Sequence, residues 1–364
     1  MIYLCIGFLL IRLLVSATNY LSRPWLAETD IPAPVTGLSV LIPARNEVEN
    51  LPRLLEALSH LEEDMEILVL NDQSEDGTEA LLQAWMDKEP RLRYLNGEAL
   101  PAGWLGKNRA CHQLAQEAKG RYLLFLDADV AAIDPSLPRR AVHDMNKRGL
   151  ALLSLFPDQI MKSQGERIVV PLMHYLLLSL LPLWWIFRLP FPSMAAANGQ
   201  FMLFDAEAYR RFQWHARVKS VIVEDIAIMQ EIKKAGLKGM TYVARGAIST
   251  RMYGSLREGV AGFSKNILAG FGNSIPAMAI FLFLIFFGWL LVAGQLSAGV
   301  CILALGMIAG IRMFVSLSAG QLVWQNLLLH PAQMLLLLYI SALSIIKRIS
   351  GKNEWKGRNV QLQG

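Results

Sequence analysis

The sequence predicts an α/β fold whose mainly parallel sheet has helices on both faces, placed between apolar segments at the two ends of the chain. Short apolar runs alternate with amphipathic stretches between about residues 36 and 265, an order typical of parallel α/β domains. Long apolar segments lie on both sides of that region. Of the 364 residues, 54% are hydrophobic and only 18% are charged, against about 25% charged in typical soluble domains. This composition excludes a disordered chain and disfavours a purely soluble protein.

The elements of the middle region are expected in a regular order. Apolar strands are predicted at residues 38–42, 65–70, 92–95 and 122–126. Helices are predicted between them at residues 47–60, 78–87 and 107–119, and later at 223–235. The first helix shows the reason, since its leucines at positions 51, 54, 55 and 58 recur at helical spacing. Ligands of such sheets bind beyond the carboxyl ends of the strands, so the residues that follow each strand are the functional candidates.

The chain begins with an apolar run in residues 1–17, where Arg12 is the only charged residue. A secretory signal peptide is the first alternative, but it needs a positively charged start and a small-residue cleavage site. The sequence starts Met-Ile-Tyr-Leu and continues without such a site to Trp25. We therefore expect residues 1–22 to form an uncleaved membrane anchor, with Arg12 and Arg23 extending toward the interface.

A second apolar region covers residues 275–346, where Arg312 and His330 are the only basic residues and no acidic residue occurs. Its segments at 275–294, 297–316 and 323–346 each approach the roughly 20 residues that cross a bilayer. Buried helices of a large soluble core are the alternative, but such helices seldom run this long without a polar face. A C-terminal transmembrane region is therefore expected.

A third apolar stretch, at residues 168–187, interrupts the middle region and contains Pro171 and Pro182. A single crossing there would place the two halves of one domain on opposite sides of a membrane. We expect instead an interfacial or re-entrant helix pair at 168–190, with Trp184 and Trp185 at head-group depth.

The basic residues of the tail, 347–364, predict that it lies in the cytoplasm by the positive-inside rule. If the middle domain is cytoplasmic too, an even number of crossings separates them, whereas three segments are counted. Either the His330-Pro331 step breaks the last segment into a re-entrant hairpin, or one segment lies flat. The expected location is the cell membrane, with several crossings.

The net charge and the cysteine content argue against nucleic-acid binding, a disulfide framework and a zinc site. The net charge of +5 is too small to indicate nucleic-acid binding, and basic residues at lipid head groups explain it better. Cys5, Cys111 and Cys301 are dispersed and have no partner at metal-binding spacing. Such a set indicates a reducing compartment and argues against a disulfide framework or a zinc site.

Polar residues follow three of the predicted strands. Residues 43–47 follow the first strand, residues 71–78 follow the second, and Asp127 and Asp129 follow the strand that ends at residue 126. Each group alone also fits a helix cap or a solvated strand end. Three such groups at one edge of one sheet are hard to explain by capping alone.

These groups suit a phosphate-bearing ligand. No Gly-x-Gly-x-x-Gly or Gly-x-x-x-x-Gly-Lys-Ser/Thr loop follows a strand, which disfavours dinucleotide cofactors and P-loop chemistry. Asp127 and Asp129 suit Mg²⁺ or Mn²⁺, which would bridge a diphosphate. Lys107 begins a helix whose free N–H groups suit phosphate oxygens. A solvated first-turn lysine is the alternative, although the helix dipole disfavours a cation at that end.

Glu224 and Asp225 stand at the start of the helix expected at 223–235. The helix dipole alone favours acidic residues in a first turn. The functional alternative is a general base, a carboxylate near the metal site that takes the proton from an acceptor hydroxyl.

Six motifs in a fixed order resemble glycosyltransferase family 2, the inverting enzymes of GT-A fold that use nucleotide sugars. They read LIPARNE, LNDQSEDGT, GWLGKNRACHQLA, FLDADV, ANGQFMLF and VEDIAIMQEIKKAG. The resemblance covers about residues 36–265. With apolar segments at both ends, the chain is similar to bacterial membrane-bound members that glycosylate carotenoids and other lipids, and the tail stretch 353–358 is similar to theirs.

The resemblance implies roles for the matching residues. Those expected to bind the nucleotide sugar are Pro43, Arg45, Glu47, Asp72, Lys107, Asp127, Gly199 and Gln200. Among these, Asp72 would accept a hydrogen bond from a uracil-like base, and Gly199 and Gln200 would lie under the sugar and acceptor. Asp129, with Asp127, would hold the metal. Asp225 would be the catalytic base, with Glu224 beside it.

One departure from the family bears on processivity. Processive polysaccharide synthases of the family carry Gln-x-x-Arg-Trp after the acidic pair, whereas residues 262–266 read Gly-Phe-Ser-Lys-Asn. Transfer of a single sugar is therefore favoured over polymerisation. Lys265 is the candidate to replace the arginine as a diphosphate contact.

The resemblance thus implies a membrane-associated, metal-assisted glycosyltransferase that moves one sugar from a donor such as UDP-glucose to a lipid or carotenoid-type acceptor with inversion. The alternatives are an exopolysaccharide synthase and an inactive nucleotide-sugar-binding membrane protein; a transporter is disfavoured because the C-terminal block has few polar residues. The expected parts are an anchor (1–22), a cytoplasmic GT-A domain (36–265), a transmembrane region (275–346) and a basic cytoplasmic tail (347–364).

Overall fold

The computed structural model describes residues 2–26, 33–62, 64–287 and 298–350, with the short pairs 354–355 and 358–359. The chain divides into two compact units. The sheet unit comprises Trp25–Ile160 and Trp185–Arg251, and the helical unit comprises Met1–Pro24, Met161–Trp184 and Met252–Gly364. The domain boundaries expected from the sequence stay predictions.

The main sheet of the sheet unit is mostly parallel, as predicted. Its described strands lie in the order β3-β2-β1-β4-β8-β6-β9, and β8 alone runs antiparallel to both of its neighbours. The strands are β1 (Thr36–Ala44), β2 (Asp64–Asn71), β3 (Leu92–Asn96), β4 (Tyr122–Leu126), β6 (Leu152–Phe156), β8 (Phe201–Asp205) and β9 (Gly239–Val243). The central strands are continuous apolar runs because both faces of the sheet are covered.

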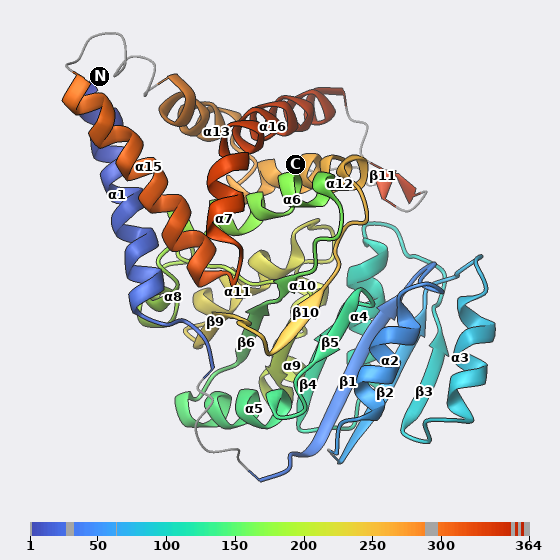
Figure 1. Cartoon of the computed structure of the whole chain (residues 1–364). Coiled ribbons are helices and arrows are strands. Elements are labelled where there is room, and N and C mark those ends of the chain that lie inside the picture. The colour runs from blue at the N-terminus through green and yellow to red at the C-terminus, as the bar shows by residue number, and fades with distance from the viewer. Residues whose placement is uncertain are drawn as a thin grey trace. The chain divides into compact units, whose positions relative to one another are not determined.

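Helices cover both faces of this sheet (Figure 1), with α2 in front of it and α4 behind it. The helices of the sheet unit are α2 (Leu51–Ser59), α3 (Thr78–Met86), α4 (Gly106–Glu117), α5 (Leu137–Arg148), α9 (Ala206–Phe212), α10 (Trp214–Arg217) and α11 (Glu224–Lys234). On one face, apolar side chains of α4, α9, α10 and α11 pack against β1, β2, β4, β6 and β8. Phe125 and Phe204 meet edge to face there, with ring centroids 5.6 Å apart.

A second, small sheet was not predicted from the sequence. It joins β5 (Val130–Ile133), β10 (Ile248–Thr250) and β7 (Asp158–Gln159) in the order β5-β10-β7. Because β5 starts at the residue after Asp129, this sheet fixes the chain on the carboxyl side of the acidic pair.

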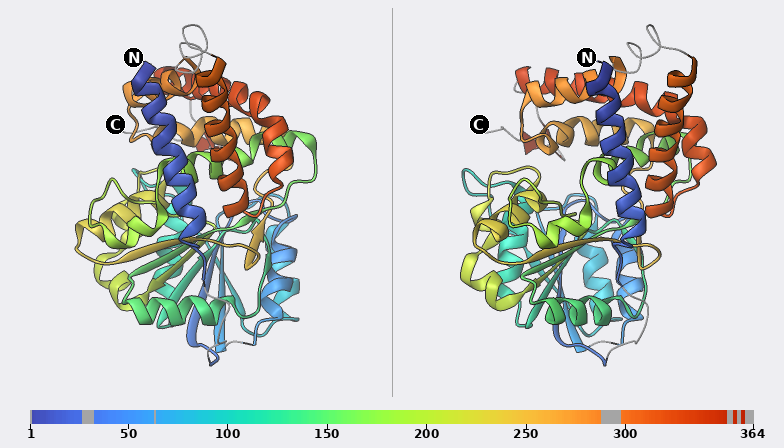
Figure 2. Two further views of the ribbon diagram at one scale, coloured as in Figure 1. Left: turned by 60° about the vertical axis from the view of Figure 1, so that its left-hand side comes forward. Right: turned by 90° about the vertical axis from the view of Figure 1, so that its left-hand side faces the viewer.

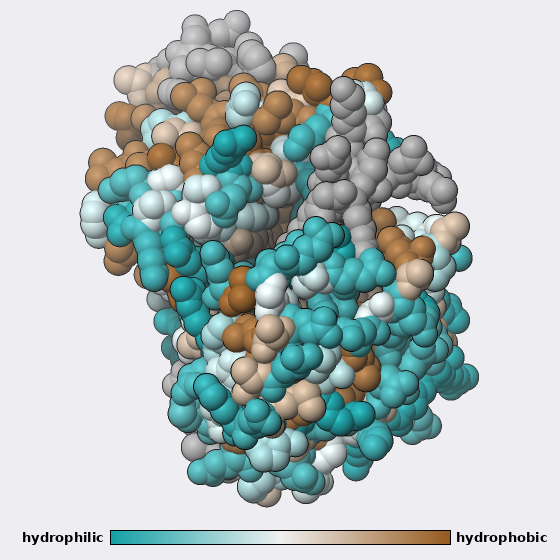
Figure 3. Space-filling model, turned by 90° about the vertical axis from the view of Figure 1, so that its right-hand side faces the viewer, coloured by the Kyte–Doolittle hydropathy of each residue, from teal (hydrophilic) through white to brown (hydrophobic). Residues whose placement is uncertain are grey.

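The helical unit contains candidate membrane-spanning helices. Its elements are α1 (Ile2–Leu21), α6 (Gln164–Val169), α7 (Pro171–Leu180), α12 (Leu256–Gly270), α13 (Ile275–Leu282), η1 (Phe283–Phe287), α15 (Ala298–Ser318), α16 (Val323–Ser350), β11 (Glu354–Trp355) and β12 (Arg358–Asn359). Helix α8 (Leu183–Arg188) lies where the chain passes into the sheet unit. Three of the described helices are long and apolar enough to cross a membrane: Tyr3–Leu21, Ala298–Ser318 and Val323–Ser350. Helix α1 lies alongside α15 (Figure 2), and hydrophobic side chains gather over the helical unit (Figure 3).

The structure refines several expectations for the apolar segments. Helix α16 continues through Pro331, so no hairpin forms at that step; an interior proline removes one helical hydrogen bond without ending this helix. A sharp bend of 108° instead separates α12 from the helix that begins at Ile275. Residues 288–294 of the first predicted segment lie outside the described residues.

Pro171 begins α7, and Pro182 lies between α7 and α8. The placement of residues 168–190 at an interface stays a prediction. The expectation that Arg12 extends toward an interface is wrong, because its side chain is 2% exposed and donates hydrogen bonds to Ser179 inside the helical unit.

Candidate active site

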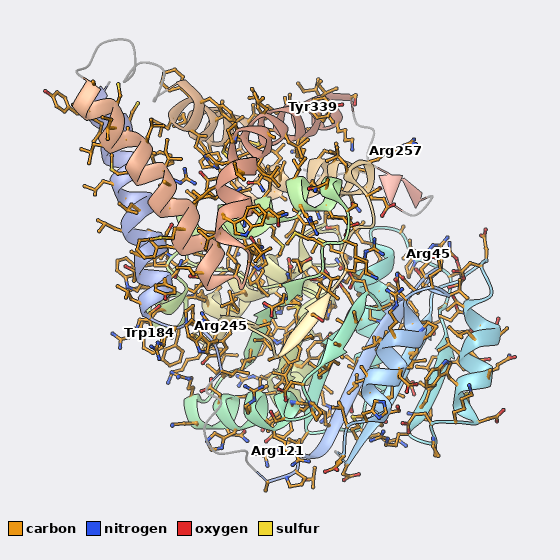
Figure 4. All side chains as sticks on the ribbon, viewed as in Figure 1. Arg45, Arg121, Trp184, Arg245, Arg257 and Tyr339 are labelled. Carbon is orange, nitrogen blue, oxygen red and sulfur yellow. The ribbon has the colours of Figure 1, made fainter. Side chains whose placement is uncertain are left out.

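The polar residues after β1 and β2 meet at the carboxyl edge of the main sheet. Figure 4 labels Arg45 at this edge and Arg121 at the opposite end of the sheet. The Arg45 guanidinium donates to the carbonyl oxygen of Asp72 at 2.8 Å. The amide of Asp72 donates to the Ala44 carbonyl at 2.7 Å, and the amide of Glu47 donates to the Thr78 hydroxyl at 3.0 Å. The predicted nucleotide-pocket residues therefore form one connected edge.

Lys107 joins residues that are far apart in the sequence. Its Nζ lies 2.8 Å from Oδ1 of Asp127 and 2.9 Å from Oε1 of Glu224. Burial disfavours the charged amine, but the two carboxylates outweigh this effect and hold the pKa of Lys107 well above its usual value. The lysine is therefore a fixed cation between the strand-end acid and the first turn of α11.

The amino end of α4 is held in place by the segment that leads to Glu224. The Asn108 side chain donates to the carbonyl of Val218 at 2.8 Å, and the Leu105 amide donates to that of Lys219 at 2.8 Å. These bonds satisfy groups that a helix end leaves open. They fix Lys107 and Glu224 relative to each other.

Asp129 has one satisfied and one unsatisfied carboxylate oxygen. Its Oδ2 accepts a hydrogen bond from Gln200 at 2.8 Å, whereas its Oδ1 is buried without a partner among the described residues. Burial, reinforced by the charge of Asp127, raises the pKa of Asp129 to about 7. A buried oxygen that lacks a donor is the kind of group that a divalent cation would satisfy.

Thr250 of β10 also supports Asp129 and was missed in the sequence. Its hydroxyl donates to the Asp129 carbonyl at 2.9 Å, and it accepts from the Gln200 side chain at 3.1 Å. Thr250 and Asp129 are brought together by the pairing of β10 with β5. No local sequence motif around Thr250 indicates that contact.

Asp225 is held by two backbone amides. Oδ2 accepts from Gly199 at 3.0 Å, and Oδ1 accepts from Ile226 at 2.8 Å. Burial, followed by repulsion from Glu224, nevertheless raises the pKa of Asp225 to about 7. A carboxylate with such a pKa can accept a proton near neutral pH.

The backbone of Gly199 passes directly over the charged cluster. A Cβ at this position would lie 2.9 Å from Nζ of Lys107 and 3.3 Å from Oε1 of Glu224. Any residue with a side chain at this position would displace the Lys107 amine, so glycine is required for the observed position of the lysine. The neighbouring Gln200 reaches Asp129, so the two residues connect the base, the cation and the acidic pair.

The structure thus brings eleven of the twelve predicted site residues onto one edge of the sheet unit. Lys265 belongs to α12 of the helical unit, and its contact with a diphosphate stays a prediction, as do the roles assigned to the others. In the described ranges, no three His, Cys, Asp or Glu side chains gather into a metal site. A cation held by Asp127 and Asp129 would need its remaining ligands from a bound substrate and water.

The chain is similar to known glycosyltransferases in sequence and in fold. The model of the family described as Glycosyl transferase family 2 matches residues 39–179. The chain is 24% identical over 247 residues to a 4,4'-diaponeurosporenoate glycosyltransferase of Staphylococcus haemolyticus, covering 66% of this chain and 63% of that protein. It is also 24% identical over 258 residues to the enzyme of the same name from Staphylococcus aureus strain MRSA252, covering 69% and 66%. The match thus spans slightly less than two thirds of these relatives.

A solved structure shares the fold. Mannosyltransferase PcManGT from Pyrobaculum calidifontis, in complex with GDP-Man and Mn²⁺, superposes with a TM-score of 0.61 at 15% identity, covering 96% of this chain and 97% of that one. The fold is therefore that of the GT-A enzymes, as expected.

Proposed function

We propose that this chain is a glycosyltransferase of family 2 and that it moves a single sugar from a nucleotide-sugar donor to an apolar acceptor with inversion at the anomeric carbon. The observation that carries the proposal is a set of contacts at the carboxyl edge of the sheet. Lys107 pairs with Asp127 and Glu224, the Gly199 amide donates to Asp225, and the neighbouring Gln200 donates to Asp129. A residue that could serve as the base, a fixed cation and residues that could bind phosphate therefore lie around one backbone segment.

The donor is proposed to bind along the carboxyl edge of the sheet. Arg45, Glu47 and Asp72 would bind the nucleoside, as the resemblance implies. Hydrogen bonds between their loops hold these residues close to one another. A uridine diphosphate sugar is the donor that the resemblance implies. Asp129, with Asp127, would hold Mg²⁺ or Mn²⁺, and the unpartnered Oδ1 of Asp129 supports this. When bound, that ion supplies a charge that stabilises the departing diphosphate.

The proposed reaction is a direct displacement. Asp225 takes the proton of the acceptor hydroxyl, and the acceptor oxygen forms a bond to the anomeric carbon. The bond from that carbon to the diphosphate oxygen breaks, and the electron pair leaves with the nucleoside diphosphate. One base with no second carboxylate acting as nucleophile gives inversion, by analogy with the two geometries of glycoside hydrolysis. The two backbone amides on Asp225 fix its orientation for this step.

The proposed acceptor is a lipid or carotenoid-type molecule with a hydroxyl or carboxyl end. Two findings support it: the relatives are named 4,4'-diaponeurosporenoate glycosyltransferases, and three described helices are candidate membrane spans. We propose accordingly that the protein resides in the cell membrane with its sheet unit in the cytoplasm.

The test is turnover of the purified full chain in lipid nanodiscs with a panel of nucleotide sugars and Mg²⁺ or Mn²⁺, followed as free nucleoside diphosphate. Release that requires both the metal and an extract of membrane lipids is expected, and mass spectrometry of the product identifies donor and acceptor. Products of distributed length would indicate a polysaccharide synthase. Absence of release together with donor binding would indicate the inactive binding protein, and both results would overturn the proposal.

A further inference from the structure

Two buried arginines of the helical unit lie against the same aromatic ring. The guanidinium carbon of Arg312, on α15, is 4.3 Å from the ring centroid of Tyr175, on α7, and that of Arg12, on α1, is 4.7 Å from it. The two arginines are 0% and 2% exposed. Both belong to candidate membrane-spanning helices, where buried charge is costly and usually functional. We call Arg12, Arg312, Tyr175, Ser179 and His330 the Tyr175 cluster.

Arg312 has no hydrogen-bond partner in the described part of the chain, although all three of its guanidinium nitrogens are buried. Arg12 donates to the neutral hydroxyl of Ser179, from Nη2 at 2.7 Å and from Nε at 3.3 Å. The ring of His330 meets Tyr175 at 5.6 Å, and its Nδ1 is also buried without a partner among those residues. The cluster therefore combines positive charge with unused hydrogen-bonding groups.

No described carboxylate neutralises this charge. The sequence of the helical unit contains three acidic residues, Glu166, Glu258 and Glu354, against twelve lysines and arginines. Glu166 and Glu258 accept hydrogen bonds at the starts of their own helices, α6 and α12. Glu354 belongs to the tail, outside the residues whose side chains the structure describes. Burial of an arginine without a counter-charge is unfavourable unless a ligand supplies one.

We propose that the Tyr175 cluster binds the oxyanion of an amphiphilic lipid, a carboxylate or a phosphate, with Arg312 as its principal ligand. A guanidinium presents paired N–H groups that match two oxygens of such an anion. Arg12 adds a second positive charge against the same ring. The helices around the cluster are apolar, so the remainder of the ligand is a hydrocarbon chain. This site does not depend on the transfer reaction proposed above.

The test uses photolabelling of the full chain in phosphatidylcholine nanodiscs. The probe is palmitic acid with a diazirine close to its carboxyl group, and the uncharged comparison is hexadecanol with a diazirine at the same position. We expect palmitate to label peptides of α7 or α15 at least tenfold more than the alcohol does. Arg312→Gln removes this preference, whereas Arg257→Gln, at an exposed arginine of α12 (Figure 4), retains it.

Competition with unlabelled compounds identifies the source of the anion. Displacement by hexadecyl phosphate or phosphatidylglycerol supports a phosphate-bearing lipid, and displacement only by unlabelled palmitate supports a carboxylate. Displacement by inorganic phosphate alone would show a site for a small anion and would overturn the lipid assignment. Equal labelling by the two probes, or unchanged labelling of Arg312→Gln, would overturn the proposal entirely.

Thermal unfolding gives a second readout in case Arg312→Gln is poorly folded. Palmitate is expected to raise the Tm of the wild-type protein in nanodiscs, because a ligand that binds only the folded state stabilises it. Arg312→Lys keeps the charge but loses the paired donors, so its Tm should rise less. An equal rise in both proteins would contradict the role of the guanidinium.

Discussion

Lys107 pairs with Glu224, with Nζ and Oε1 2.9 Å apart, and thereby leaves the adjacent Asp225 without an ion pair from this lysine. Asp225 instead accepts two backbone hydrogen bonds and has a pKa raised to about 7. The two neighbouring carboxylates thus differ in their environments: one neutralises a cation and the other is available to a proton. Such a difference in environment between Glu224 and Asp225 is typical of sites that carry out acid–base chemistry.

Asp225→Asn should reduce turnover by about 10²–10⁴-fold, the usual contribution of a general base, with little effect on donor binding. The amide keeps the shape of the side chain but cannot take the proton. The measurement is the rate of nucleoside diphosphate release together with the Kd for the donor. The matched control is Glu231→Gln, at a partly exposed acid of the same helix, which should keep wild-type rates. Wild-type turnover of Asp225→Asn would exclude it as the base.

The rate should depend on pH through the same carboxyl group. Because the pKa of Asp225 is about 7, the base is protonated at lower pH, and kcat/KM should fall about tenfold per pH unit below that value. Above it, the profile should level off. The measurement is a pH profile of kcat/KM for the wild-type enzyme, with the donor well below its KM. A profile flat from pH 5 to pH 8 would contradict the assignment.

The raised pKa also predicts how stability changes with pH. Between the ordinary carboxyl value of 3.8 and about 7, the folded state holds a proton at Asp225 that the unfolded chain has lost. The contribution of Asp225 to stability therefore decreases as the pH rises through this window. Asp225→Asn lacks the titrating group, so its Tm should change less between pH 4 and pH 7 than that of the wild-type protein. Parallel curves would contradict the prediction.

Gly199→Ala should lower kcat/KM by about 10²-fold, the scale of a 1 Å misplacement in an active site. The new methyl group would lie 2.9 Å from Nζ of Lys107, so the lysine must move away from its carboxylates. The fold should remain, because the obstructing atom is the end of a flexible side chain. Gly306→Ala is the control, since a Cβ there meets nothing within 4 Å. Equal activity of the two variants would show that this close approach is unimportant.

The strands that could be predicted from the sequence are those whose continuous apolar side chains are buried in the sheet. The apolar run at 122–126 is β4, and the runs at 38–42 and 65–70 lie within β1 and β2. The small sheet was missed because β5, β7 and β10 have two to four residues each and are defined by partners distant in the sequence. The Asp129–Thr250 contact spans 121 positions, which no local pattern reveals.

The start of a helix and the position of a buried charge also depend on partners distant in the sequence, which local patterns do not reveal. The first helix was expected from Glu47 but begins at Leu51, because the amide of Glu47 donates to Thr78 of the neighbouring loop. Arg12 was expected at an interface because an isolated anchor offers it no other polar site, whereas α7 supplies Ser179. The closeness of the candidate site residues could be predicted because their motifs follow the ends of neighbouring strands; their ion-pair partners could not, and their roles stay predictions.

Removal of divalent metal should abolish turnover, and Asp129→Asn should raise the Mn²⁺ concentration needed for half-maximal activity by at least tenfold. The reason is that Oδ1 of Asp129 is buried without a donor in the described chain, and an amide in its place supplies no charge to a cation. Activity is titrated with Mn²⁺ after treatment with a chelator. Asp87→Asn, at an exposed aspartate after α3, is the control and should match the wild type. If the enzyme keeps full activity after chelation and without added metal, Asp129 would instead be assigned to the sugar alone.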